Sequence, residues 1–269
     1  MFTTIKEVLK EHFTWRHQIL KLAKADIIKT YSGAALGWAW ALIKPTITIL
    51  VYWFAFSVGL RQGKDINGFP YILWLISGVI PWFFMSEMIT GGAGAIRKYK
   101  YLVTKMKFPV STIPTFISLS KLAVHLCLLA IVMVLFLLFG YKPDIYWLQL
   151  PLYMLCMVMF FIMWALFSSM LASMSKDFLN LVKSLTTAVF WMSGIMWDIN
   201  RIATPWIQTV LKFNPVTFIV TGYRNVFIYK TWIWEDVSGL VYFAIVFVIM
   251  MIAALWSYKK LIREIPDVL

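Results

Sequence analysis

Six long apolar runs dominate this sequence and limit what it can fold into. Each is close to the about 20 mainly apolar residues that a helix needs to cross a bilayer. The runs are residues 38–60, 71–90, 113–139, 150–174, 179–197 and 237–258. Hydrophobic residues make up 61% of the chain and charged residues 14%, against about 45–50% and about 25% in soluble domains. A soluble fold could not bury so much apolar surface. The sequence therefore predicts an all-α integral membrane protein with six transmembrane helices.

Residues 1–35 differ from the rest because their apolar side chains recur at helical spacing and lie near one face. The apolar set is Ile5, Val8, Leu9, Phe13, Ile19, Leu20, Ala23, Ile27 and Tyr31, and most lysines lie elsewhere. This pattern predicts an amphipathic helix that lies in the membrane interface. A helix packed on a partner protein would show the same pattern. The membrane-spanning domain then extends over residues 36–269.

Residues 201–230 are apolar enough for a seventh span, but their centre argues against one. Lys212, Asn214 and Pro215 lie in the middle, where a spanning helix would bury a charge and lose hydrogen bonds. The apolar pieces on either side are each too short to cross. We therefore expect two short re-entrant helices that turn at Asn214-Pro215, in a position surrounded by protein or by a water-filled cavity.

The distribution of basic residues predicts the orientation in the membrane. With six spans and an internal N-terminus, the inner segments hold 17 of the 25 Lys and Arg residues and the outer segments hold 7. Cytoplasmic loops carry the excess of Lys and Arg. We therefore expect a multi-pass protein of the cell membrane with both termini in the cytoplasm. The net charge of +13 then reflects anionic lipid at the cytoplasmic face rather than nucleic acid.

The inner loop at residues 95–109 is basic and has no acid. Read as a helix of about three turns, its apolar residues gather on one side and its cations flank them. The apolar residues are Tyr99, Leu102, Val103 and Met106, and the cations are Arg97, Lys98 and Lys105. Such a helix fits a docking element for a soluble partner, with apolar anchors and charged surroundings. A plain cytoplasmic anchoring loop would account for the charges alone.

The sequence shows no motif for catalysis, metal binding or nucleotide binding. It has no His/Cys cluster, no nucleophile motif and no phosphate-binding loop. Glu87 is the only acid well inside a predicted span, which is a thin basis for a proton-coupled carrier. We expect no catalytic residue and no cofactor in this chain, so any nucleotide chemistry must come from another polypeptide.

Several short motifs, in order along the chain, carry a resemblance to a known family. They are Tyr31-Ser32 followed by Leu36-Gly37, Trp40 and Pro45, then Lys107-Phe108-Pro109 with Pro114, and finally Asn214-Pro215 and Tyr223-Arg224. Together with the order of predicted elements, they resemble the membrane subunits of ABC-2-type polysaccharide exporters. The resemblance covers nearly the whole chain.

The resemblance implies a partner set and a mechanism. Two copies of the chain would pair, and each would hold a separate cytoplasmic ATPase, which carries ATP and Mg, on its basic loop. The cargo would be a polymer linked to polyprenyl diphosphate. Wall teichoic acid is the first expectation, and O-antigen or capsule the alternative. A membrane enzyme acting on polyprenyl-linked sugars, and a channel or secondary carrier, are competing readings from other classes.

This cargo would need cations for its diphosphate and aromatic faces for its sugars. Lys24, Lys29 and Lys44 lie near the expected inner interface, where they could meet the diphosphate or simply pair with lipid phosphate. Aromatic residues are 17% of the chain, and most of them belong to interfacial belts or packing. The candidates for the translocation path are Trp38, Trp40, Trp53, Trp74, Trp82, Phe83, Trp191 and Trp197.

Overall fold

The computed structural model describes residues 2–33, 35–59, 65–106, 108–199 and 202–265. Within these ranges the chain is helical apart from turns and one isolated bridge between Ile66 and Phe69. Three positions named above lie outside them: Leu60 at the end of the first predicted span, Lys107 in the basic loop, and Arg201 at the start of the predicted re-entrant segment.

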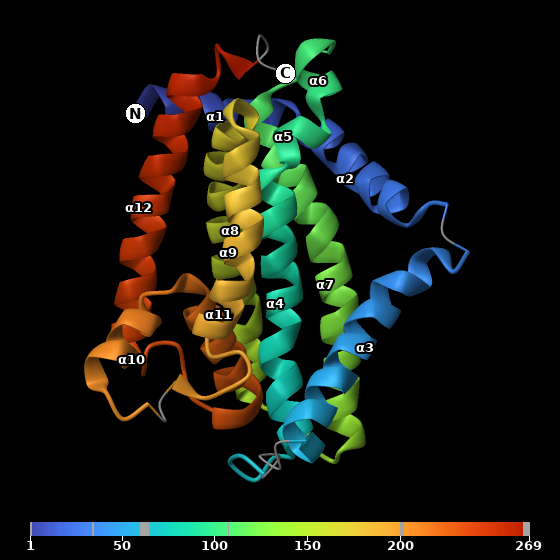
Figure 1. Cartoon of the computed structure of the whole chain (residues 1–269), viewed down its shortest axis with the longest axis vertical. Coiled ribbons are helices and arrows are strands. Elements are labelled where there is room, and N and C mark those ends of the chain that lie inside the picture. Colours follow the sequence, from blue (N-terminus) through green and yellow to red (C-terminus); the bar gives the residue numbers. More distant parts are fainter. Residues whose placement is uncertain (1, 34, 60–64, 107, 200–201, 266–269) are drawn as a thin grey trace.

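Five helices of the described residues are long and apolar enough to cross a membrane. They are Gly37–Gly59, which contains α3 (Trp40–Trp53), then α4 (Tyr71–Ala93), α7 (Ile113–Leu138), α8 (Leu150–Met174) and α12 (Val237–Leu261). The fifth predicted span corresponds to α9 (Lys176–Met192), which is shorter at 17 residues and runs beside α4 and α8 (Figure 1). The all-helical membrane fold is thus confirmed. Among the described residues, five helices are long enough to cross a membrane, where six were predicted.

The helix starts follow local sequence signals. Proline lies in the first turn of α7, α8, α10 (Pro205–Lys212) and α11 (Pro215–Arg224). Proline suits this position because its missing N–H has no partner there and its φ is already helical. Asn214 caps α11, since its side-chain oxygen accepts the N–H of Val216 at 3.0 Å.

Helix α4 is the centre of the bundle. In the most apolar stretch of α4, 78% of the residues are buried inside the chain. The helix packs on α7, α8, α9 and α11. Gly92 permits its close approach to α8, because a Cβ there would lie 2.8 Å from the Cβ of Ala165. Small residues at such crossings let membrane helices pack closely.

The N-terminal segment forms two helices, α1 (Phe2–Thr14) and α2 (Arg16–Tyr31), where one was predicted. Trp15 separates them with a non-helical backbone. Glu11 of α1 accepts hydrogen bonds from Ser111 and, at 3.2 Å, from Tyr258 of α12. Helix α1 therefore docks across the ends of the bundle, beside the end of α12 and the loop helices α5 (Ala95–Lys98) and α6 (Lys100–Thr104) (Figure 1). We call this the α5 end.

Helices α10 and α11 lie at the opposite end of the molecule, which we call the α10 end (Figure 1). They form a hairpin that turns at Phe213 and Asn214. Asn214 also donates to Ser193 Oγ at 2.8 Å, which ties the turn to the end of α9. Two short helices thus lie within the predicted segment 201–230, and their re-entry into the membrane stays a prediction.

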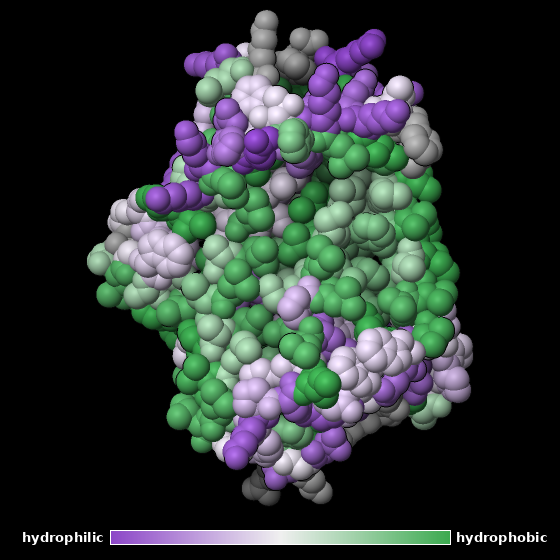
Figure 2. Space-filling view, turned by 180° about the vertical axis from the view of Figure 1, so that it is seen from behind, coloured by the Kyte–Doolittle hydropathy of each residue, from purple (hydrophilic) through white to green (hydrophobic). Residues whose placement is uncertain are grey.

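The surface has an apolar band between two polar ends (Figure 2). The segment Gly37–Gly59, which contains α3, is almost uncovered, since only 6% of its most apolar stretch is buried inside the chain. A helix this apolar and this uncovered requires lipid or another protein around it.

Candidate functional site

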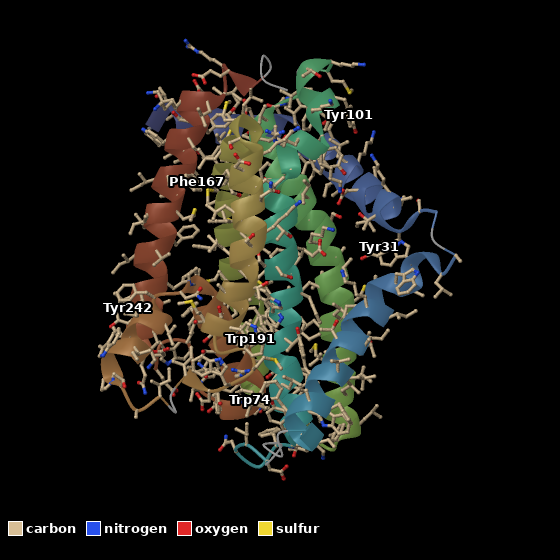
Figure 3. The ribbon with its side chains drawn as sticks, in the orientation of Figure 1. Tyr31, Trp74, Tyr101, Phe167, Trp191 and Tyr242 are labelled. Atoms are coloured by element: carbon tan, nitrogen blue, oxygen red, sulfur yellow. The ribbon has the colours of Figure 1, made fainter. Side chains whose placement is uncertain are left out.

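A pocket of about 570 Å³ lies between α3 on one side and α4 and α7 on the other. Trp40 and Lys44 of α3 line it, together with Trp82 and Phe83 of α4. The end of α2 closes one side with Tyr31, which Figure 3 shows beside α3. The volume is in the range of small-molecule sites, about 300–1,000 Å³. The fold thus brings four predicted site residues, distant in sequence, to one cavity.

The pocket holds two lysines and one carboxylate. Lys121 of α7 lies 3.3 Å from Glu87 of α4, so this pair neutralises itself. Lys44 has no ion pair among the described residues, and its side chain is exposed. Of the two lysines that line the pocket, Lys44 is therefore the one whose charge is available to an anionic ligand.

His125 connects this pocket to the hairpin at the α10 end. It lines the pocket from α7, and its Nε2 lies 2.7 Å from the hydroxyl of Tyr223 on α11. Both side chains are buried. His125 therefore joins the lining of the pocket to α11.

The other two lysines predicted for a diphosphate lie elsewhere. Lys24 and Lys29 are exposed on α2 and do not line the pocket. Only the end of α2, at Thr30 and Tyr31, reaches the pocket. Lys24 and Lys29 therefore lie outside this pocket, and the prediction that they meet the diphosphate near the inner interface stays a prediction.

The predicted path aromatics do not share one environment. Trp40, Trp82 and Phe83 line the pocket, and Trp38, Trp53 and Trp191 are exposed on the outside of this chain. Trp197 is half-buried and donates to the carbonyl of Trp191 at 2.9 Å. Trp74 is the exception, with 1% of its surface exposed.

Trp74 is a packing residue in this chain. Its Nε1 donates to Tyr229 at 2.9 Å, and the guanidinium of Arg224 lies over its ring at 3.5 Å. No face of the ring remains for a sugar, so its prediction as a path residue is wrong.

The basic loop differs from the predicted single helix. Tyr99 has a non-helical backbone and separates α5 from α6. Tyr99, Leu102 and Val103 are buried in the chain's own core, while Met106 is 63% exposed. The predicted docking face is thus wrong for the three buried residues, since their apolar surface already packs inside the molecule. The exposed apolar residues here are Tyr101 (Figure 3) and Met106, with Lys105 beside them.

Two of the predicted flanking cations are also held within the chain. Arg97 donates to the carbonyls of Ala172 and Ser173, at the end of α8. Cations favour this position because helix ends carry unpaired carbonyls and a partial negative charge. Lys98 forms an ion pair with Asp26 of α2, with 2.6 Å between Nζ and Oδ1.

Asp26 is a buried carboxylate that joins three helices. Besides Lys98, it accepts hydrogen bonds from Tyr99 and, at 2.6 Å, from Ser120 of α7. Burial acts to raise the pKa of Asp26, but these hydrogen bonds and the charge of Lys98 outweigh it, so its pKa lies below the usual value of an aspartate. The carboxylate is therefore ionised at neutral pH and fixes α2 to the basic loop.

The burial of Asp26 has a signal in the sequence, although Asp26 is not among the site residues predicted above. Ile19, Ala23 and Asp26 follow helical spacing and are the buried residues of α2. A charged residue on such a stripe is rarely buried unless it is paired. The same helix ends at Tyr31, about 7.5 Å further along its axis, so α2 links the basic loop to the pocket.

These features define an integral membrane protein with a helical bundle, a lined pocket and an N-terminal helix tied to a basic loop. The sequence matches the ABC-2 type transporter family over residues 17–228, and the chain belongs to this family. It is similar to the O-antigen export system permease protein RfbA of Myxococcus xanthus, with 26% identity over 97% of this chain and 98% of that protein. A protein of the same name from Klebsiella pneumoniae is 21% identical over 93% of this chain and 94% of its own length.

Proposed function

We propose that this chain is the permease subunit of an exporter that moves an O-antigen-type polysaccharide, linked to polyprenyl diphosphate, across the cell membrane. The observation that carries the proposal is its similarity, over nearly the full length of both chains, to proteins named O-antigen export system permease proteins. These names favour O-antigen, and none of them supports the first expectation of wall teichoic acid.

Energy for export would come from a separate cytoplasmic ATPase that carries ATP and Mg. Membership of the ABC-2 type family supports this, as does the lack of a phosphate-binding loop in the sequence. The docking surface would be α6 and the residues after it, where Tyr101, Lys105 and Met106 are exposed. The α5 end, with both termini, would then face the cytoplasm.

A second copy of the chain would cover α3. This helix is apolar and almost uncovered, and Trp38 and Trp53 are exposed along the same stretch. Aromatic residues are enriched at protein interfaces. Two copies and two ATPases would make a complex with the path between its permeases.

The pocket beside α3 would receive the cargo's diphosphate and first sugar. Lys44 offers a positive charge, and Trp40, Trp82 and Phe83 offer apolar faces within the same cavity. Lysine binds phosphate as a point charge, and aromatic rings contact sugar rings and lipid tails alike. The link from this pocket through α2 to the basic loop supports coupling between cargo and ATPase.

Depletion of the chain in its own cells tests the proposal. We expect the surface polysaccharide to disappear while its polyprenyl-linked form accumulates inside the cell. Both changes should reverse when the chain is expressed again. Normal surface polysaccharide after full depletion would overturn the proposed function.

Lys44→Gln tests the pocket, and Lys29→Gln is the matched control. Loss of one charge-assisted hydrogen bond to the diphosphate should lower the export rate roughly tenfold. Lys29 is exposed and outside the pocket, so its variant should export nearly as the unaltered chain does. Equal export by the two variants at equal protein levels would contradict the assignment of Lys44.

A further inference from the structure

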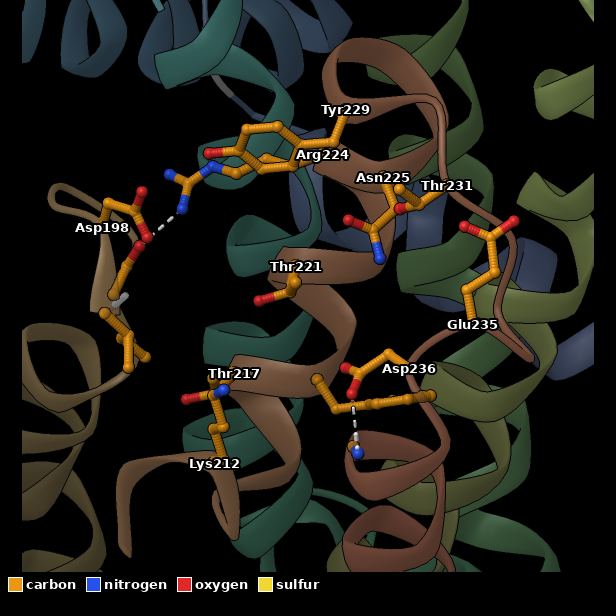
Figure 4. Close-up of a pocket in the computed structure, with 14 residues that line it drawn as sticks. Asp198, Lys212, Thr217, Thr221, Arg224, Asn225, Tyr229, Thr231, Glu235 and Asp236 are labelled. Carbon is orange, nitrogen blue, oxygen red and sulfur yellow. Dashed lines mark hydrogen bonds between the residues drawn. The ribbon is translucent and has the colours of Figure 1, made fainter. Parts of the chain in front are cut away.

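A second pocket, of about 420 Å³, lies at the α10 end (Figure 4), which is opposite the basic loop in Figure 1. Helix α11 forms one wall with Thr217, Thr221 and Arg224. The segment after α9 and the start of α12 complete it. No step described above uses this pocket.

The wall on α11 presents its polar groups in one direction. Thr217, Thr221 and Arg224 follow each other at intervals of four and three residues, so they share one face of the helix. Figure 4 shows the two hydroxyls and the guanidinium on the same side of α11. The packing of this helix fixes the wall in place, since a Cβ on Gly222 would lie 2.2 Å from the Tyr153 ring.

Arg224 is held in position by the chain itself. It donates to the carbonyls of Gly194, at 2.7 Å, and Ile195, at 2.5 Å. Gly78 of α4 leaves it room, because a Cβ there would lie 2.6 Å from the guanidinium. These contacts join α11 to the end of α9 and leave Nε of Arg224 without a hydrogen-bond partner among the described residues.

Thr217 has a buried hydroxyl without a partner. The residue is 4% exposed, and its Oγ1 makes no hydrogen bond within the described part of the chain. Threonine in a helix commonly donates to the carbonyl four residues earlier, but Thr217 lies in the first turn of α11, so that residue precedes the helix. An unpaired buried hydroxyl costs about 1–3 kcal/mol, which a ligand that bonds to it would recover.

The charges and hydrogen-bonding groups of the other lining residues indicate which class of ligand the pocket would bind. Asp198, Glu235 and Asp236 supply carboxylates, and Lys212 and Asn225 supply donors. Three carboxylates against the two cations Lys212 and Arg224 disfavour an anionic ligand such as phosphate. In the described ranges no group of three or more His, Cys, Asp or Glu residues is placed to hold a metal ion.

A neutral ligand that both donates and accepts hydrogen bonds fits this lining. Adjacent hydroxyls of a sugar donate to carboxylates and accept from amide, ammonium and hydroxyl groups. From this chemistry we propose that the pocket at the α10 end binds one saccharide unit of the transported polymer. The proposal rests on the proposed function for its role in export, and the binding itself is measured independently of export.

Weak binding suits this position. A site along a transport path must bind well enough to be occupied and weakly enough to release. A saccharide held between α11 and α12 would be bound by a few hydrogen bonds, each worth about 1 kcal/mol. The pocket would retain the emerging polymer between ATPase cycles.

The test is saturation-transfer NMR on the purified full-length chain with three soluble probes. These are the methyl glycosides of glucose, mannose and N-acetylglucosamine, with glycerol as a small polyol for comparison. We expect at least one glycoside to bind more strongly than glycerol. Thr217→Val keeps the shape of the side chain and removes the hydroxyl, so it should weaken binding roughly fivefold.

Thr209→Val is the matched control, because Thr209 lies on α10 outside the lining and donates to Pro205 at 3.1 Å. It should bind the glycoside as the unaltered chain does. Thr217→Val removes an unpaired buried hydroxyl, so its melting temperature should be unchanged or higher. Glu235→Gln provides a second variant of an exposed lining residue and should also weaken binding.

Each result decides the proposal. Binding that is lost in Thr217→Val and Glu235→Gln, and kept in Thr209→Val, supports it. Absence of glycoside binding above glycerol, or equal binding by Thr217→Val, overturns it. Neither result depends on whether depletion of the chain stops export, so failure of the proposed function would be seen separately.

Discussion

Asp26 is a buried carboxylate that ties α2 to the basic loop and to α7. It lies on an otherwise apolar stripe and accepts hydrogen bonds from Lys98, Tyr99 and Ser120. A buried carboxylate is costly unless it is paired and hydrogen-bonded, and here both conditions are met. The position of α2 against the basic loop therefore depends on one ionised group.

Asp26→Asn should lower the stability of the purified chain at pH 7. We expect a loss on the order of 2 kcal/mol, less than for a fully buried pair, because the Lys98 side chain is 43% exposed. The folded pKa of Asp26 is lowered, so its contribution is complete above the unfolded value of about 3.9 and is lost as the pH falls through the folded pKa.

Melting temperature in detergent at several pH values measures this effect. The difference between the unaltered chain and Asp26→Asn should be largest near neutral pH and should shrink below about pH 4. Glu7→Gln removes an exposed carboxylate of α1 and serves as the control. A constant difference at all pH values would contradict the role of the ionised carboxylate.

The break in the loop helix at Tyr99 changes which residues are exposed to the proposed ATPase. Tyr101 and Met106 are exposed, whereas Tyr99 and Leu102 pack inside the chain. Apolar anchors at the centre of an interface carry most of its affinity. The surface that we propose for docking is therefore smaller than the predicted one and contains Tyr101 and Met106.

A double variant of Tyr101 and Met106 to Ala should release the ATPase and leave the melting temperature of the chain unchanged. The matched pair, Tyr99→Ala with Leu102→Ala, should lower the melting temperature, because a buried large-to-small change costs about 2–5 kcal/mol. Affinity capture with tagged ATPase and thermal melting distinguish the pairs. Retention of the ATPase by the first pair would refute this docking surface.

The limits of two span helices, α7 and α8, could be predicted closely from apolar length and charge, whereas α9 (Lys176–Met192) begins and ends earlier than the predicted 179–197. Residues 150–174 were predicted and α8 has the same bounds, while α7 ends one residue earlier than predicted. The break at Tyr99 could not be predicted, since its cause is tertiary: Tyr99 packs against Phe116 and bonds Asp26. Periodicity also cannot show that the guanidinium of Arg224 lies over the Trp74 ring, because the two residues are 150 positions apart in sequence.

The pocket was only partly predictable for the same reason. Trp40, Lys44, Trp82 and Phe83 were selected by residue type, and the fold brings them together. The pairing of Glu87 with Lys121 joins two helices, and nothing in either local sequence indicates it. Residue type therefore identified several side chains that line the pocket, but not the contacts that these and other lining residues make.

The arrangement of the two ends predicts the topology of the chain. Tyr101 lies at the α5 end (Figure 3), whereas Trp206 on α10 and Trp234, which follows α11 in sequence, are both exposed. Labelling of single cysteines with a membrane-impermeant maleimide tests this in a background that lacks Cys127 and Cys156. Trp206→Cys and Trp234→Cys should label in intact cells, and Tyr101→Cys only after permeabilisation. Labelling of Trp206→Cys and Trp234→Cys from opposite sides would establish a seventh span.

We propose that this permease works only with a separate ATPase. The most direct measurement is gentle purification of the tagged chain from its own membranes, followed by identification of its partners and an assay of ATP hydrolysis. We predict that an ABC ATPase copurifies in equal amount with the chain and that the complex hydrolyses ATP. A chain that purifies alone and still moves the polymer in vesicles without ATP would contradict the account.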